Sequence, residues 1–209
     1  MKKENINFLF EKLQEMYPDA NTELNYWNEF QLLLAVILSA QTTDKQVNKV
    51  TENLFDIVKS PIDVLNIWLD KFTQKISSIN YYKTKAKNIF NTAKMLYKDS
   101  SLLRNDLDVL KSLPGVWIKT AKVVSHVLFW SKVIAVDTHV YRVSNRLWLV
   151  NAKTPEKTSE LLEKKVADKY KGIAHHGLIL FGRYHCLARN PKCSLCPFNT
   201  FCKYYKKIK

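Results

Sequence analysis

The sequence is poor in residues that break helices and join domains. Glycine occurs only four times in 209 residues, and Gly115 is the only one before residue 172. No glycine- or serine-rich linker separates domains, and the Asn-Gly and Asp-Gly pairs typical of β-hairpins are absent. No segment alternates polar and apolar residues with the period of a strand. These absences argue against a β-rich fold and against two domains joined by a flexible linker.

Long apolar runs are also missing. The longest extends from Leu32 to Leu38, far short of the roughly 20 residues that span a bilayer. Met1-Lys2-Lys3 precedes an amphipathic segment rather than the apolar core and cleavage site of a signal peptide. The sequence therefore predicts a cytoplasmic protein with no membrane partner.

Helical periodicity is present along nearly the whole chain. Residues 30–38 are apolar on most sides, which predicts a buried central helix. Helix starts are predicted at Ser60-Pro61 and Thr154-Pro155, and Asp44 is expected to cap the helix that follows it. One apolar stripe at helical spacing comprises Ile6, Leu9, Phe10, Leu13 and Met16. With 46% hydrophobic residues, the chain can bury a globular core, and we predict an all-α protein.

The charge balance is strongly basic. The formal net charge is +14, from 33 Lys and Arg against 19 Asp and Glu. This excess favours a polyanionic partner, with nucleic acid first. Most of the cations are lysines, which an AT-rich genome also enriches, so charge by itself does not decide the partner.

A tight turn is predicted at Pro114-Gly115, between two helices. The pattern predicts a short helix that ends at Leu113 and a second helix from near Trp117 to Phe129. Gly115 permits close approach of the backbone, and the free N–H groups of the second helix's first turn point at an anion. This hairpin favours a site for DNA phosphate over a plain helical hairpin, which is the alternative.

Two charged residues near this hairpin are candidates for catalysis. Lys119 lies in the first turn of the second helix, where the macrodipole disfavours a cation. An ammonium destabilised by the dipole and by partial burial is a usable amine nucleophile, although a phosphate-binding lysine fits equally well. Asp137 ends an apolar segment and enters another helix. It is expected to cap that helix, and a carboxylate there can also assist an amine in cleaving a glycosidic bond.

All four cysteines fall in one short segment near the C-terminus. Cys186, Cys193, Cys196 and Cys202 follow the pattern C-x6-C-x2-C-x5-C, which indicates metal ligands rather than disulfides. Structural zinc sites with four cysteines usually contain two C-x2-C pairs, whereas this pattern has one. The spacing therefore favours a [4Fe–4S] cluster, and a zinc site in an otherwise inert helical module is the alternative.

Together these motifs resemble the endonuclease III family of base-excision repair enzymes. The resemblance rests on the hairpin with Lys119, the Val-Asp-Thr-His segment with Asp137, and the cysteine spacing. The segments 38–44 (Leu-Ser-Ala-Gln-Thr-Thr-Asp) and 182–186 (Gly-Arg-Tyr-His-Cys) extend it over almost the whole chain. It implies a two-lobed helix-hairpin-helix glycosylase fold. A six-helix domain would span residues 22–132, and a discontinuous domain, 1–21 and 133–209, would carry the cluster loop 186–202.

The resemblance also implies an activity. The protein would be a bifunctional DNA glycosylase and AP lyase that removes oxidised pyrimidines from double-stranded DNA and cuts at abasic sites, acting as a monomer at the nucleoid. Lys119 would attack C1′ of the flipped nucleoside and form a Schiff base, β-elimination would cut the strand on the 3′ side, and Asp137 would be the essential carboxylate. The four cysteines would hold the [4Fe–4S] cluster. Residues expected to contact DNA are Ser39, Gln41 in the gap left by the flipped base, Tyr81 as the wedge, Leu113, Gly115, Val116, Thr120 and His139.

Two positions depart from the family pattern. Trp117 replaces the second glycine of the hairpin, where an indole would obstruct the phosphate, repack the lobe or add a contact. Asn80 stands where the family usually has glycine, and its tolerance of the left-handed conformation is expected to preserve that turn. A non-catalytic DNA-binding protein is the alternative function. Retention of Lys119 and Asp137 favours the enzyme, because a binding protein needs neither.

Three histidines complete the candidates. His139 closely follows Asp137, and a place on the helix surface fits it as well as a contact with DNA. His175 and His176 share a helix with Leu178 and Phe181, and a structural role is predicted for both.

Overall fold

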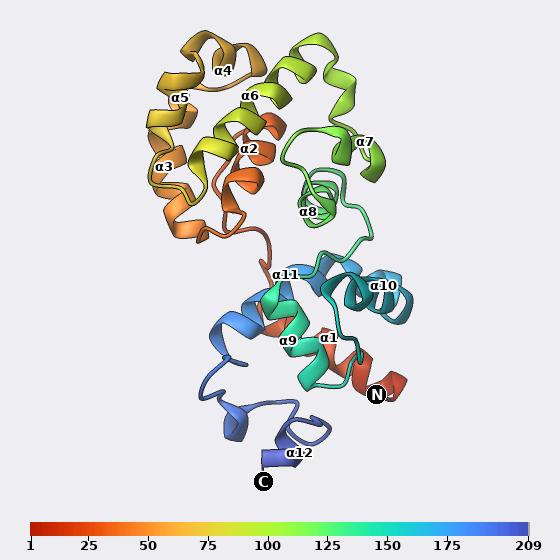
Figure 1. Ribbon diagram of the computed structural model, residues 1–209. Helices are drawn as coiled ribbons and strands as arrows, with labels where there is room; N and C mark the ends of the chain where they lie inside the picture. The colour runs from red at the N-terminus through yellow and green to blue at the C-terminus, as the bar shows by residue number, and fades with distance from the viewer. Residues whose placement is uncertain (209) are drawn as a thin grey trace. The chain divides into compact units, whose positions relative to one another are not determined.

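A computed structural model describes residues 1–208 of the chain (Figure 1). Within these residues the regular elements are helices and there is no strand, which confirms the all-α prediction. The chain divides into two compact units. Glu23–Ser131 is called the hairpin unit below, and Met1–Thr22 together with the residues from Lys132 onward is called the cysteine unit. Each unit has its own apolar core.

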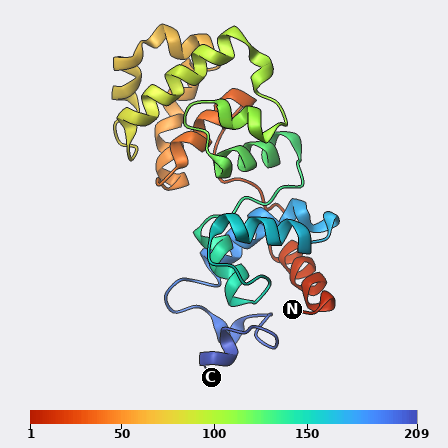
Figure 2. The ribbon, with the colours of Figure 1, turned by 45° about the vertical axis from the view of Figure 1, so that its right-hand side comes forward.

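The hairpin unit is built around one buried helix. α2 (Glu29–Ser39) contacts α3, α6 and α8 (Figures 1 and 2), and every side chain from Phe30 to Leu38 is buried, as its apolar pattern predicts. The other helices of this unit are α3 (Asp44–Ile57), α4 (Pro61–Ile67), α5 (Leu69–Lys75), α6 (Tyr82–Lys98), the short 3₁₀ turn η1 (Ser100–Leu102), α7 (Leu107–Ser112) and α8 (Ile118–Phe129).

Side-chain caps set several helix starts in this unit. Ser60 precedes Pro61 at the start of α4, and Asp63 completes a capping box with Ser60. At α3 the expected cap is wrong by one residue. The Thr43 side chain accepts from the Gln46 N–H, and Asp44 is the first helical residue. There the Asp44 carboxylate still interacts favourably with the positive end of the helix.

In the cysteine unit α11 (Asp168–Tyr184) packs against both α1 (Lys3–Met16) and α9 (Thr138–Arg146). Leu9, Phe10 and Phe181 are completely buried in this core. The predicted Thr154-Pro155 start is confirmed, because Thr154 caps α10 (Pro155–Lys165). The chain ends with the 3₁₀ turn η2 (Cys193–Leu195) and α12 (Tyr205–Ile208).

Two further features bear on the sequence predictions. His175 and His176 are buried, and His175 Nδ1 lies 2.8 Å from the Ala135 carbonyl oxygen, so both have the structural placement predicted for them. Among residues 1–208, no helix has the length and apolar character needed to cross a bilayer.

Candidate functional site

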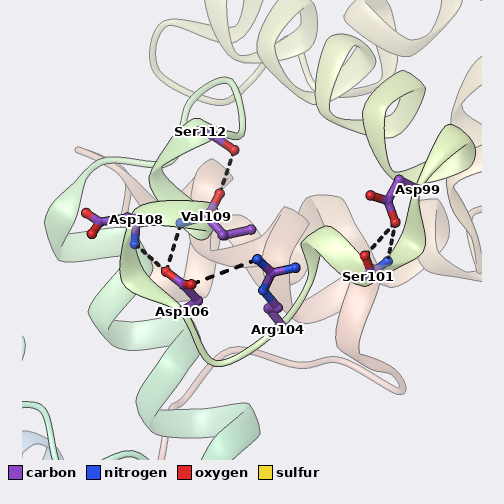
Figure 3. Close-up of polar contacts among 7 residues, drawn as sticks. All are labelled: Asp99, Ser101, Arg104, Asp106, Asp108, Val109 and Ser112. Carbon is purple, nitrogen blue, oxygen red and sulfur yellow. Dashed lines mark hydrogen bonds and ion pairs between the residues drawn. The ribbon is translucent and has the colours of Figure 1, made fainter.

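The hairpin is formed by α7, the five-residue connection 113–117 and α8. Asp106 caps α7 by accepting from the N–H groups of Asp108 and Val109 (Figure 3). The helix ends at Ser112 with Leu113 as its C-cap, and α8 begins at Ile118 with Trp117 as its N-cap. Each of these two helix ends lies within one residue of its predicted position.

Gly115 has a conformation that requires glycine. Its φ is +83°, and a Cβ added there would lie 3.0 Å from Asn88 Cβ on α6. The turn is anchored on the same helix, because Thr92 Oγ1 donates to the Pro114 carbonyl oxygen at 2.9 Å. The connection is therefore held close to α6 in a shape that a residue with a side chain would disturb.

The first turn of α8 presents free backbone donors. The earliest bond within this helix runs from the Ala121 N–H to the Trp117 carbonyl oxygen, and no side chain caps its start. The N–H groups of Ile118, Lys119 and Thr120 precede that bond, so they are available to an anion. Thr120 itself is buried.

Leu113 and Val116, which are also predicted to contact DNA, lie in the connection between the two helices. Their side chains are buried, and their N–H groups donate within the turn, to the carbonyl oxygens of Leu110 and Leu113 respectively. Both residues therefore shape the connection, and neither has a free N–H for a phosphate.

Two residues at the start of α8 point away from the core. Lys119 is exposed, so the partial burial expected for it is wrong. Trp117 is 78% exposed and has φ −91° and ψ 171°, an extended conformation open to any residue. The indole thus neither repacks the hairpin unit nor occupies a backbone geometry that demands glycine.

Asp137 caps α9 in the cysteine unit, as predicted. Its Oδ1 accepts from the Val140 N–H at 2.8 Å, and the side chain is half-buried at the end of the buried segment Ile134–Val136. The next candidate, His139, is also half-buried and accepts through Nδ1 from Arg142 Nη2 at 3.2 Å. Asp137 therefore has one carboxylate oxygen committed to the cap.

The segment after α2 carries three further candidates. Ser39 Oγ donates to the Val36 carbonyl oxygen, and Gln41 is exposed with φ 55°. Tyr81 is 66% exposed and takes φ 58° as the N-cap of α6. The expectation that Asn80 is left-handed is wrong, because Tyr81 takes that conformation instead. The Asn80 side chain donates to the Gln41 carbonyl oxygen.

Sequence reasoning missed Lys85. This α6 residue is buried, and its ammonium donates to the carbonyl oxygens of Leu38 and Ala40 and to Thr42 Oγ1. Burial lowers the pKa of Lys85 from 10.5 to about 8. A sequence signal existed, since Lys85 lies four residues before the buried Ile89 and hence on the core face of its helix.

The four cysteines line one cavity, together with Phe181 and His185 among other residues. Burial raises the pKa of Cys196 to about 11 and also raises the pKa values of Cys193 and Cys202, with neighbouring thiols adding to the effect. Thiols held this way resist ionisation unless positive charge offsets burial, which metal ions supply.

The surroundings of this cavity fit an iron–sulfur cluster. Arg146 Nη1 lies 3.7 Å from Cys186 Sγ. The buried Nε2 of His185 has no hydrogen-bond partner within residues 1–208. Four thiols around a shared cavity suit a group in which each binds a different iron.

Comparisons with known proteins agree with these features. Residues 34–168 match the family model described as HhH-GPD superfamily base excision DNA repair protein, and residues 186–202 match that of the iron-sulfur binding domain of endonuclease III. The chain is 42% identical to endonuclease III of Rickettsia conorii over 100% of both chains. It is 45% identical to endonuclease III of Bacillus subtilis over 95% of this chain and 91% of that protein.

Solved structures give the same picture. A trapped covalent endonuclease III–DNA intermediate superposes with a TM-score of 0.92 at 41% identity, covering 100% of this chain and 99% of the other. A thermostable thymine-DNA glycosylase has a TM-score of 0.87 at 23% identity over 98% of each chain, which shows a common fold.

Proposed function

The chain belongs to the endonuclease III family of base-excision DNA repair proteins, and we propose that Lys119 and Asp137 carry out its chemistry. It is a DNA glycosylase and AP lyase with an iron–sulfur cluster. The observation that carries the residue assignment is the position of Lys119. The lysine projects from the first turn of α8, among the backbone donors that would hold a phosphate.

The proposed reaction begins with the amine of Lys119. Its lone pair attacks C1′ of the extruded nucleoside, the bond from C1′ to the base breaks, and the base leaves with that electron pair and takes up a proton. The adduct opens to a Schiff base. Loss of a proton from C2′ then expels the 3′ phosphate and cuts the strand.

Asp137 is proposed to assist through its second carboxylate oxygen. Oδ1 accepts from Val140 N–H, which fixes the orientation of the group and leaves Oδ2 outside the cap. A carboxylate held in this way can take a proton from the amine and stabilise the positive charge that develops on the sugar.

The proposed substrate is double-stranded DNA that contains oxidised pyrimidines or abasic sites. The free N–H groups after Gly115 would hold one phosphate, which fixes the position of the backbone without reading sequence. Gln41 would fill the gap left by the flipped base and Tyr81 would wedge the opposite strand, while Ser39, Thr120 and His139 remain predicted contacts. We expect a monomer that acts on DNA in the cytoplasm, at the nucleoid.

Cys186, Cys193, Cys196 and Cys202 are proposed to hold the [4Fe–4S] cluster of this family. A bound cluster would cross-link the loop 186–202 through four iron–sulfur bonds. Lys192 on this loop and Lys203 directly after it would offer positive charge to DNA phosphates.

Borohydride trapping on a duplex with one abasic site tests the proposal. The protein should form a covalent adduct that disappears in Lys119→Gln. Lys122→Gln is the matched control, because it removes the same charge from the same helix one turn later. If the adduct still forms in Lys119→Gln, Lys119 is not the nucleophile. If the unsubstituted protein forms no adduct, the proposed lyase chemistry is wrong.

A further inference from the structure

Gln41 and Tyr81 share an unusual backbone geometry. Both are exposed non-glycine residues in the left-handed region, with φ 55° and 58°. Such a conformation costs conformational energy and persists only where surrounding contacts enforce it. Contacts that enforce it should therefore exist beside both residues.

Lys85 supplies the first set of contacts. Its ammonium has three N–H donors, and it meets three acceptors, the carbonyl oxygens of Leu38 and Ala40 and the Thr42 hydroxyl. These acceptors lie at the C-terminal end of α2, where helical carbonyls lack partners and a positive charge is favoured. All three of these hydrogen bonds go from the lysine to residues 38–42, the segment that contains Gln41.

Side chains from the turn before α6 supply the second set. Asn80 Nδ2 donates to the Gln41 carbonyl oxygen, which ties the backbone of one left-handed residue to the neighbour of the other. Gln46 Nε2 on α3 donates to Ser78 Oγ at 2.8 Å and joins the same two segments a second time. A glycine at position 80 would have no side chain with which to make the first of these bonds.

We propose that Lys85 and Asn80 are positioning residues that hold Gln41 and Tyr81 as one preformed unit. The proposal rests on the proposed function, in which these two exposed side chains enter the duplex beside the extruded nucleotide. Both segments become ordered when the protein folds, so the free-energy cost of ordering them does not weaken DNA binding. In this chain the gap-filling and wedging residues are joined by a side chain, rather than each being held separately.

The test compares cleavage of an abasic site in duplex DNA with cleavage of the same strand when single-stranded. Only the duplex has a gap to fill and an opposite strand to wedge. Asn80→Gly removes one hydrogen bond from an exposed turn, and Lys85→Met removes the buried ammonium. Lys87→Met is the matched control, because Lys87 is an exposed lysine on the same helix. Amide exchange of α2 and α6 establishes that each variant is folded.

The ratio of duplex to single-strand kcat/KM should fall about 2- to 10-fold in Asn80→Gly, the range that one hydrogen bond supplies. It should fall further in Lys85→Met and stay within twofold in Lys87→Met. When Gln41→Ala is already present, Asn80→Gly should have a smaller effect, because the Gln41 side chain that Asn80 helps to position is then absent.

A ratio that is unchanged in Asn80→Gly and in folded Lys85→Met, while borohydride trapping still succeeds, would overturn the positioning role and leave the proposed function intact. Equal losses on both strands would also overturn it, since they would indicate a general structural defect. Failure of trapping with the unsubstituted protein would overturn the proposed function, and with it this inference.

Discussion

Gly182 lies where α11 meets α9, and its replacement by alanine should destabilise the cysteine unit. A Cβ there would lie 2.9 Å from His139 Cβ, 3.1 Å from Val143 Cγ2 and 3.3 Å from His139 Cα. The two helices cannot simply separate, because Arg142 Nη2 donates to the Gly182 carbonyl oxygen at 2.7 Å and Arg142 Nε to that of Cys186 at 3.1 Å.

The magnitude follows from two opposing terms. Overpacking a close contact costs about 1–3 kcal/mol, whereas alanine favours a helix over glycine by about 1 kcal/mol. Gly172 on the same helix separates these terms, because a Cβ there would meet nothing within 4 Å. Gly172→Ala should therefore be stabilising by about 1 kcal/mol, and the difference between the two variants, about 1–3 kcal/mol, isolates the contact with α9.

Native-state hydrogen exchange of α11 amides is the suitable measurement. It reports the opening free energy of this unit without requiring the whole chain to unfold in one step. Gly182→Ala should show faster exchange of protected amides, and Gly172→Ala should show slower exchange. Equal stability of the two variants would refute the reasoning, because it would mean that α9 moves aside at no cost.

Three further predictions concern the proposed chemistry and its support. Asp137→Asn should retain the α9 cap, since asparagine caps helices as well as aspartate, yet its single-turnover rate of base release should fall by about 100-fold or more. A wild-type rate would show that Asp137 only caps the helix. Trp117→Gly should weaken duplex binding about fivefold or more, because a 78% exposed indole can stack at the DNA surface; tighter binding, measured by fluorescence anisotropy, would identify the indole as an obstacle. Burial lowers the pKa of Lys85 from 10.5 to about 8, so the unfolded chain binds this proton more tightly than the folded protein does. The unfolding free energy of the unsubstituted protein should therefore rise from pH 8 to 10.5 relative to that of Lys85→Met. If the unfolding free energies of the two proteins change with pH in parallel, the ammonium is not buried.

Local sequence rules accounted for many helix ends and for the cysteine loop. The Ser60-Pro61 and Thr154-Pro155 starts are predictable because a cap and a proline act on backbone groups within a few residues. Gly115 is predictable for the same reason, since its φ of +83° belongs to the turn itself. The roles of Lys119 and Asp137 in catalysis stay predictions that trapping and base-release assays would test.

Tertiary structure decided the placement of side chains that meet across the chain. The spacing of Lys85 from Ile89 places it on the core face of its helix, but only packing against the end of α2 makes it a buried donor to that segment. Tyr81 rather than Asn80 takes the left-handed conformation, and the Asn80 side chain donates to the Gln41 carbonyl oxygen, 39 residues earlier. The sequence by itself determined where helices begin, where the turn must be glycine and which thiols share a loop. Which residues hold the DNA-facing segments in place depended on contacts between distant segments, which local propensity does not encode.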